Sequence, residues 1–139
     1  MPYPAELVQP MREELTALGV QELMDAGQVE SFLGQSGTKL IFINSVCGCA
    51  AGQARPALRI ALEHATKPDA IATVFAGQDL DATSAARAAF PEIPPSSPSA
   101  AILDANNDVV WFMPRHKIES RDAQTIAFDF VTAFDNCCA

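Results

Sequence analysis

Residues 39–65 read KLIFINSVCGCAAGQARPALRIALEHA, and this stretch decides which fold the rest of the chain completes. Its first part, residues 39–45, is apolar without polar alternation, which is typical of a strand buried on both faces. From residue 50 to about residue 65 the apolar side chains recur at helical spacing. Pro56 lies inside this predicted helix and is expected to kink it, because its ring crowds the carbonyl four residues earlier.

The segments on both sides of this stretch continue the alternation of strands and helices. Helices are predicted over residues 10–19, 25–33, 81–90 and 119–134, and strands over residues 20–24, 70–76, 100–103 and 109–113. The last two strands flank an Asn-Asn turn and are expected to form a hairpin. Repeated strand–helix units favour a parallel sheet with helices on both faces, and the closing hairpin makes the sheet mixed. This α/β order is that of the thioredoxin fold, with one extra N-terminal helix.

Local signals mark the starts of three of the predicted helices. Pro10 is expected to be the first helical residue, where its missing N–H costs nothing. Asp25 followed by Gln28 resembles a capping box, in which each residue bonds the backbone near the other. Asp81 is expected to cap the helix that follows it.

Length, composition and charge limit the classes of protein to which the chain can belong. Its 139 residues fit one domain, predicted over residues 1–139, and 49% hydrophobic with 19% charged residues exclude a disordered chain. Nine basic against seventeen acidic residues give a net charge of −8, which argues against nucleic-acid binding. No apolar run approaches the roughly 20 residues of a membrane span. Since MPYPAELVQP lacks a signal-peptide pattern, we expect a soluble cytoplasmic protein with no nucleic-acid or membrane partner.

The four cysteines fall into two close pairs. Cys47 and Cys49 are separated by one glycine, and Cys137 and Cys138 are adjacent. A secreted scaffold would spread its cysteines along the chain to close long loops. Clustered pairs in a chain without a secretion signal point instead to redox or metal chemistry.

The first pair lies where a buried strand is predicted to end and a helix to begin. Ligand sites of open α/β sheets lie at such carboxyl ends of strands. The unpaired N–H groups at the start of a helix favour the thiolate, which is the nucleophile of disulfide exchange. Two other interpretations stay open: ordinary buried thiols, and a metal site to which all four cysteines contribute. The metal interpretation lacks the usual spacing of two or more residues between ligands.

The motif NSVCGCAAGQARPA, residues 44–57, closely resembles the signature of the bacilliredoxins, which are small bacterial thioredoxin-like proteins. The segments VQPMREELTALG, PPSSPSAAIL and FMPRHKIE resemble family segments in the family's order. The resemblance implies removal of bacillithiol from mixed disulfides on cytosolic proteins, weak thiol–disulfide oxidoreductase activity and no cofactor. The sequence does not explain the role of Met11 and Arg12 within the first of these segments.

Carried over by resemblance, Cys47 matches the attacking cysteine of the family and Cys49 matches its partner. Cys47 would attack the bacillithiol sulfur of a client's mixed disulfide, and the client would leave as a reduced thiol. Either Cys49 or free bacillithiol would then release the adduct from Cys47, and the sequence does not say which.

Three further residues are candidates for substrate binding. Pro98 stands just before a predicted strand, where the thioredoxin fold keeps a cis-proline facing the redox pair, and Pro95 is the alternative. Arg55 is a candidate for binding the carboxylates of bacillithiol, although a solvated position on the helix face fits it equally well. Asn44 ends the strand before the motif and could donate hydrogen bonds there, or it could simply terminate the strand.

Two other functions remain open from the sequence alone. One is a general disulfide isomerase or reductase without preference for bacillithiol, and the other is a carrier of metal or sulfur that uses thiolates as ligands. Cys137 and Cys138 are expected at a frayed chain end with no catalytic role. The sequence leaves open a homodimer in which these two thiols reach the site of a second subunit.

Overall fold

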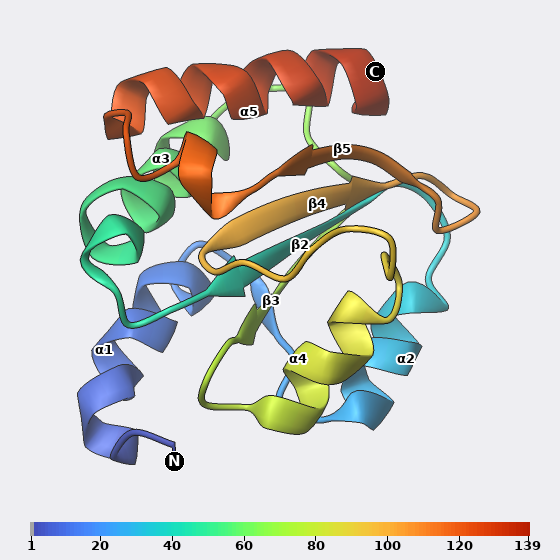
Figure 1. The fold of residues 1–139 in the computed structure, drawn as a ribbon. Coiled ribbons are helices and arrows are strands. Elements are labelled where there is room, and N and C mark those ends of the chain that lie inside the picture. The colour runs from blue at the N-terminus through green and yellow to red at the C-terminus, as the bar shows by residue number, and fades with distance from the viewer. Residues whose placement is uncertain (1) are drawn as a thin grey trace.

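A mixed five-stranded sheet forms the centre of the molecule in the computed structural model, which describes residues 2–139. The strand order is β1-β3-β2-β4-β5 (Figure 1). The strands are β1 (Gln21–Glu22), β2 (Lys39–Asn44), β3 (Ala70–Phe75), β4 (Ser99–Leu103) and β5 (Val109–Met113). β3 pairs in parallel with β1 and β2, whereas β4 pairs antiparallel with β2 and β5. The mixed sheet with a closing hairpin is therefore as predicted.

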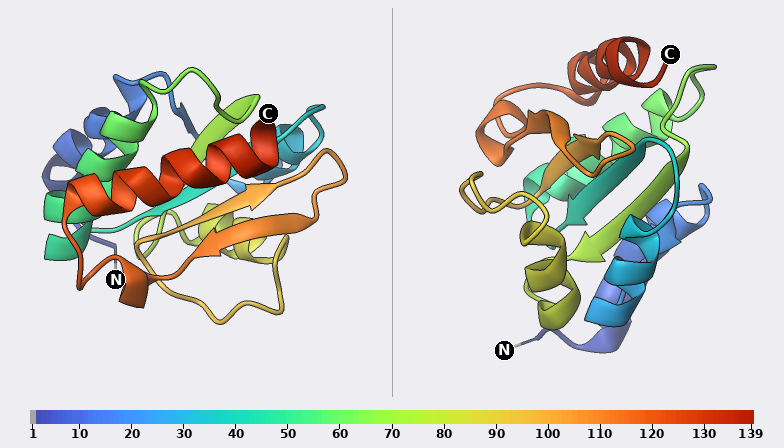
Figure 2. Two further views of the ribbon diagram at one scale, coloured as in Figure 1. Left: turned by 90° about the horizontal axis from the view of Figure 1, so that it is seen from above. Right: turned by 90° about the vertical axis from the view of Figure 1, so that its right-hand side faces the viewer.

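Helices cover both faces of this sheet (Figures 1 and 2). They are α1 (Ala5–Thr16), α2 (Ala26–Leu33), α3 (Arg55–Ala61), α4 (Leu80–Arg87) and α5 (Ala123–Cys138). α3 and α5 pack together on one face, and α2 and α4 pack on the other (Figure 1). No helix within residues 2–139 combines the length and the apolarity needed to cross a bilayer.

β2 occupies the middle of the sheet, and all six of its residues are buried. Leu40 and Phe42 belong to the core under α3 and α5. Ile41 and Ile43 point to the opposite face and belong to the core under α2 and α4. The uninterrupted apolar run follows from this burial, because both faces of the strand need apolar side chains.

α1 begins at Ala5, so the prediction that Pro10 is the first helical residue is wrong. Pro10 lies inside the helix. The buried residues Val8, Arg12 and Leu15 follow helical spacing on both sides of it. The packing of this face against the domain outweighs the one backbone hydrogen bond that Pro10 cannot donate.

Two other helix starts also differ from prediction, and one agrees. α4 begins at Leu80 after Asp79, so Asp81 lies in its first turn and is not the cap. α5 begins four residues later than predicted, at Ala123, because Asp122 caps it by accepting a 2.8 Å hydrogen bond from the Thr125 amide. Asp25 does cap α2, accepting a 2.8 Å hydrogen bond from the Gln28 amide.

Arg12 ties α1 to the rest of the fold through a nearly buried ion-pair cluster. Its guanidinium donates to both carboxylate oxygens of Asp79 at 2.7 and 2.9 Å and to Glu22 at 3.0 Å. The same group lies 5.3 Å from the centroid of the Phe75 ring. The cluster joins the extra N-terminal helix to β1 and to the start of α4. It supplies the role that the sequence leaves unexplained for Arg12.

We expect Asp79→Asn to lower the free energy of unfolding by about 2 kcal/mol, because Arg12 loses its principal counter-charge in a site shielded from water. Urea unfolding followed by circular dichroism measures this change. Asp81→Asn is the matched control, since Asp81 is exposed in the first turn of the same helix. Its effect should stay within about 0.5 kcal/mol. Equal effects of the two substitutions would contradict the assignment.

Candidate active site

The motif with Cys47 and Cys49 connects the end of β2 to a helical turn. The carbonyl of Cys47 accepts hydrogen bonds from the amides of Ala50 at 3.1 Å and Ala51 at 3.2 Å, so the turn starts at Cys47. The turn Ala50–Ala54 is π-helical and leads directly into α3. The predicted disturbance at Pro56 takes this form, and α3 ends at Ala61, four residues before the predicted end. Cys47 thus lies at the N-terminal end of a helical segment.

The sulfur atoms of Cys47 and Cys49 lie 2.9 Å apart, and both cysteines are free thiols. This distance is a hydrogen-bond contact and is longer than the covalent S–S bond of roughly 2.05 Å. Both residues are partly exposed, and Gly48 between them is exposed with open space beside it. The pair is therefore accessible to a large substrate from outside.

The two thiols have pKa values shifted in opposite directions. Burial acts to raise the pKa of Cys47, but hydrogen bonds from the Cys49 thiol, the Ser45 hydroxyl and the amides of Ala50 and Cys49 outweigh it, so the pKa is lowered. Burial raises the pKa of Cys49, and the adjacent Cys47 sulfur raises it further. Cys47 is therefore the more acidic thiol, and Cys49 is the proton donor beside it.

A buried hydrogen-bond cluster fixes the end of β2 directly under the cysteine turn. Nη1 of Arg55 donates to Oδ1 of Asn44 at 2.9 Å and to the carbonyl of Ser45 at 2.8 Å. Asn44 also accepts from the Ser45 amide at 2.9 Å and donates to the carbonyl of Met11 at 3.3 Å. Nε of Arg55 lies 3.1 Å from the Glu14 carboxylate, without the alignment of a hydrogen bond. The contact at position 11 is to the backbone carbonyl, so it ties α1 to the end of β2 whatever the side chain there.

Neither Arg55 nor Asn44 lies where a substrate would meet it. Arg55 is only 2% exposed and Asn44 only 1%, so Arg55 does not occupy the solvated helix face that the sequence allows. Their polar atoms are directed at each other, at Ser45 and at α1. Both residues hold the end of β2 in place under the cysteine turn through buried hydrogen bonds.

Pro98 lies beside the cysteine turn, and the Ser97–Pro98 peptide bond is cis, as predicted. β4 pairs with β2 so that Ser99 lies opposite Ile43, which places Pro98 next to the end of β2. Pro98 is buried, whereas the alternative Pro95 is exposed in the preceding loop.

Arg115 belongs to the site, although the sequence analysis did not select it. Its Nη1 donates to the carbonyl of Ser97 at 3.2 Å, and its amide donates to the Ser96 hydroxyl at 3.3 Å. Its positive charge acts to lower the pKa of Cys49. The register of the hairpin explains why Arg115 reaches the site. Met113 pairs with Ala100, so the chain that leaves β5 runs back toward Pro98.

Cys137 and Cys138 lie at the other end of β2. They form the last turn of α5 and pack against the core, so they are not the frayed tail that the sequence predicts. Burial raises the pKa of both, and Cys138 contacts Thr38 just before β2. Six strand residues at about 3.3 Å each separate this end from the first pair by roughly 20 Å. The four cysteines of one chain therefore do not form a common site, and no group of three potential metal ligands converges within residues 2–139.

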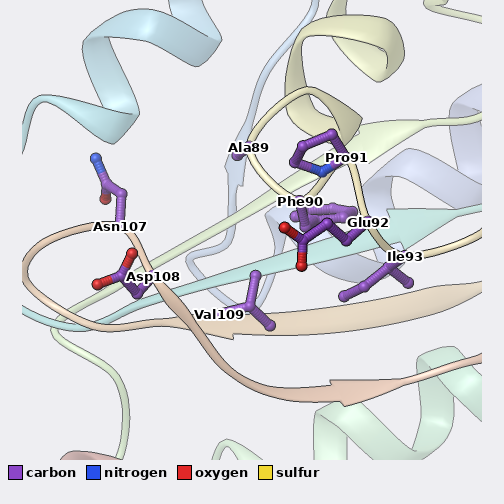
Figure 3. Close-up of a pocket in the computed structure, with 8 residues that line it drawn as sticks. All are labelled: Ala89, Phe90, Pro91, Glu92, Ile93, Asn107, Asp108 and Val109. Carbon is purple, nitrogen blue, oxygen red and sulfur yellow. The ribbon is translucent and has the colours of Figure 1, made fainter.

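One surface hollow lies far from the first cysteine pair. A hollow of about 390 Å³ lies between the end of α4 and the β4–β5 hairpin. The Glu92 and Asp108 carboxylates are among the side chains that line it (Figure 3). This hairpin follows Leu103, which pairs with Lys39 at the start of β2. The cysteine pair lies at the opposite end of the sheet and is partly exposed. A second hollow, of about 450 Å³, is lined by Ser96, Pro114 and His116 around Arg115.

Comparison with known proteins places this geometry in a family. The family model described as "Disulphide isomerase" matches residues 3–138. A bacilliredoxin of Shouchella clausii is 49% identical over 137 residues, covering 98% of this chain and 94% of the relative. A bacilliredoxin of Symbiobacterium thermophilum is 53% identical over 126 residues, covering 90% of this chain and 89% of the relative.

Solved structures match the fold at lower identity. A thioredoxin of Malassezia sympodialis is 13% identical, with a TM-score of 0.57, and the match covers 86% of this chain and 91% of that one. Agreement at this level concerns the fold alone. The predicted thioredoxin-like fold is confirmed.

We expect iodoacetamide at pH about 6 to label Cys47 ahead of Cys49, because the lowered pKa leaves more Cys47 as thiolate at that pH. Ser45→Ala removes one hydrogen bond to the sulfur, so the pKa of Cys47 rises and the labelling rate falls roughly 3- to 10-fold. Peptide mass spectrometry locates the label, and samples quenched at successive times give the rate of Cys47 labelling. Ser84→Ala is the control, because Ser84 is an exposed residue of α4, and it should leave the rate of Cys47 labelling unchanged. Faster labelling of Cys49 would reverse the two roles.

Replacing both Cys137 and Cys138 with serine should leave disulfide exchange at Cys47 unchanged, because β2 separates the two pairs. The measurement is turnover of a mixed-disulfide substrate across a range of protein concentrations. Serine substitution is preferable to truncation here, since the last turn of α5 packs on the core. A loss of turnover that depends on protein concentration would instead indicate exchange between two subunits.

Proposed function

Because the chain belongs to the bacilliredoxin family of thiol–disulfide oxidoreductases, we propose that it removes bacillithiol from mixed disulfides on client proteins, with Cys47 as the nucleophile. One observation carries the proposal: an acidified, accessible Cys47 lies 2.9 Å from a thiol of raised pKa. Such a pair combines a thiolate that attacks a disulfide with a second thiol that completes the exchange.

The first step transfers bacillithiol from the client to Cys47. The Cys47 thiolate attacks the bacillithiol sulfur, a new S–S bond forms, and the client's S–S bond breaks. The client cysteine leaves with the electron pair of the broken bond and takes up a proton. Cys49 is protonated and within hydrogen-bond distance of Cys47. It does not compete as a nucleophile during this step.

The second step releases bacillithiol by one of two routes. Cys49, after losing its proton, attacks Cys47 and forms an internal disulfide while bacillithiol leaves as a thiol. The internal disulfide then needs an external dithiol or two monothiols to return to the reduced form. Alternatively, a free bacillithiol thiolate attacks the adduct and leaves as oxidised bacillithiol, which restores the Cys47 thiolate directly. The 2.9 Å contact between the sulfurs favours the internal route.

We assign Pro98 to the surface that receives the mixed disulfide, because the sheet register puts it beside the cysteine turn. For Arg55 and Asn44 we propose a positioning role in place of substrate contact, since both are buried and bonded to Ser45. The cytoplasm is the compartment in which we expect the reaction, because it keeps such thiols reduced.

A second candidate is general disulfide isomerisation or reduction without preference for bacillithiol. The description of the matching family model as a disulphide isomerase favours it. The two functions share the chemistry at Cys47 and differ in whether the enzyme recognises the small thiol. The two candidate functions can be distinguished by comparing turnover of one client protein loaded with different small thiols.

We expect Cys47→Ser to abolish bacillithiol release from a client protein loaded with bacillithiol, because the only thiol left in the turn, Cys49, has a raised pKa and stays protonated. Cys49→Ser should accumulate a bacillithiol adduct on Cys47 and keep partial turnover when free bacillithiol is supplied. Intact-protein mass spectrometry detects the adduct, and gel-shift labelling of the freed client thiol gives turnover. Cys137→Ser is the matched control and should behave as the unaltered protein. Full turnover by Cys47→Ser would sink the mechanism.

A further inference from the structure

Arg115 is held beside the reactive pair from two sides. On one side its amide and Nη1 bond Ser96 and Ser97 of the loop that precedes β4. On the other side Gln53, in the π-helical turn after Cys49, donates through Nε2 to the carbonyls of Ile118 at 2.9 Å and Arg121 at 2.6 Å. The segment that carries Arg115 is therefore fastened to the same turn that carries the cysteines.

The guanidinium of Arg115 still has N–H groups that are free to bind a ligand. Nε pairs with Glu119 at 3.1 Å and Nη1 with Ser97, while Nη2 has no hydrogen-bond partner among residues 2–139. The side chain is 43% exposed. A guanidinium that presents free N–H groups to solvent matches the planar geometry of a carboxylate.

Three of the other arginines are already occupied by protein partners. Arg55 is buried against Asn44 and Ser45, and Arg12 is bound by Asp79 and Glu22. Arg121 is paired with Asp129. Arg115 is an exposed arginine whose charge also acts on both reactive sulfurs, as the mutual effects on the pKa values of Cys49 and Arg115 indicate.

The overall charge of the protein disfavours an acidic ligand, so a local cation would favour binding of such a ligand. The chain carries a net charge of −8, so a small anionic thiol meets a repulsive field over much of the surface. A single cation next to the sulfurs offsets this field where the reaction takes place. Glu119 neutralises part of the Arg115 charge, and Lys117 and His116 follow Arg115 on the same exposed segment.

We propose that Arg115 forms a carboxylate-binding subsite, which holds the acidic small-thiol half of a mixed disulfide while Cys47 attacks its sulfur. The inference rests on the proposed function, since bacillithiol is a thiol rich in carboxylates. It assigns to Arg115 the recognition that the sequence suggests for Arg55. The subsite determines which small thiol is accepted, and the thiol exchange itself remains with the cysteines.

The test compares one client protein loaded either with bacillithiol or with uncharged 2-mercaptoethanol. Arg115→Gln should raise the KM for the bacillithiol-loaded client roughly tenfold, the loss of about one charged hydrogen bond. The kcat for that client should stay within about twofold. The mercaptoethanol-loaded client has no carboxylate to lose, so its constants should also change by no more than about twofold, through the effect of the Arg115 charge on the pKa of Cys49. Arg115→Lys keeps the positive charge but loses the planar guanidinium. Its KM for the bacillithiol-loaded client should lie between those of the unaltered protein and Arg115→Gln. Arg59→Gln, on an exposed arginine in the last turn of α3, is the control.

Each outcome bears on a different claim. Nearly unchanged turnover of the mercaptoethanol-loaded client shows that the Arg115→Gln protein is folded and that its cysteines react normally. If that variant keeps the same preference for bacillithiol as the unaltered protein, the subsite is overturned and the proposed function stands. An equal loss with both clients also overturns the subsite, because Arg115 would then act on the thiols and not on the ligand. If the unaltered protein shows no preference between the clients, the proposed function itself fails.

Discussion

The buried guanidinium of Arg55 is the constraint on which the reactive site depends. A charge taken out of water must be matched by hydrogen bonds, because an unpaired one is strongly destabilising. Arg55 meets this demand by binding the Asn44 side chain and the Ser45 carbonyl at the end of β2. The strand end therefore cannot move without exposing or orphaning the charge. That rigidity is passed to Cys47, whose amide donates to the Ser45 hydroxyl at 3.2 Å.

This arrangement explains why two chemically identical thiols behave differently. Cys47 stands at the start of the helical turn, where amides and the Ser45 hydroxyl stabilise its thiolate. Cys49 lies one residue further on, beside a sulfur that already carries the negative charge, so its own ionisation is disfavoured. Opposed shifts within one pair assign the nucleophile and the proton donor by position alone. Gly48 between them is exposed, with open space beside it.

The sequence predicts the elements whose signals are local, and it misses those set by tertiary contact. The apolar run of β2, the Asp25 cap and the hairpin all follow from short-range patterns, and each is observed. Arg55 occupies a helical position that spacing alone leaves equally compatible with solvent. Only the packed α1 and the strand end show that the position is interior. Pro10 is missed for the same reason, since packing of α1 outweighs its local preference.

The site combines a segment that is fixed by the core with segments that are less tightly held. β2 and the turn after it carry the thiols and are locked by buried contacts, so changes there affect the chemistry. The loop before β4 and the segment after β5 reach the same place only through sheet register, with Ser99 opposite Ile43 and Met113 opposite Ala100. Within them Arg115, His116 and Lys117 lie at least partly at the surface, so these side chains can change without opening the core. The substrate recognition proposed for Arg115 therefore rests on a different segment from the one that carries the thiols.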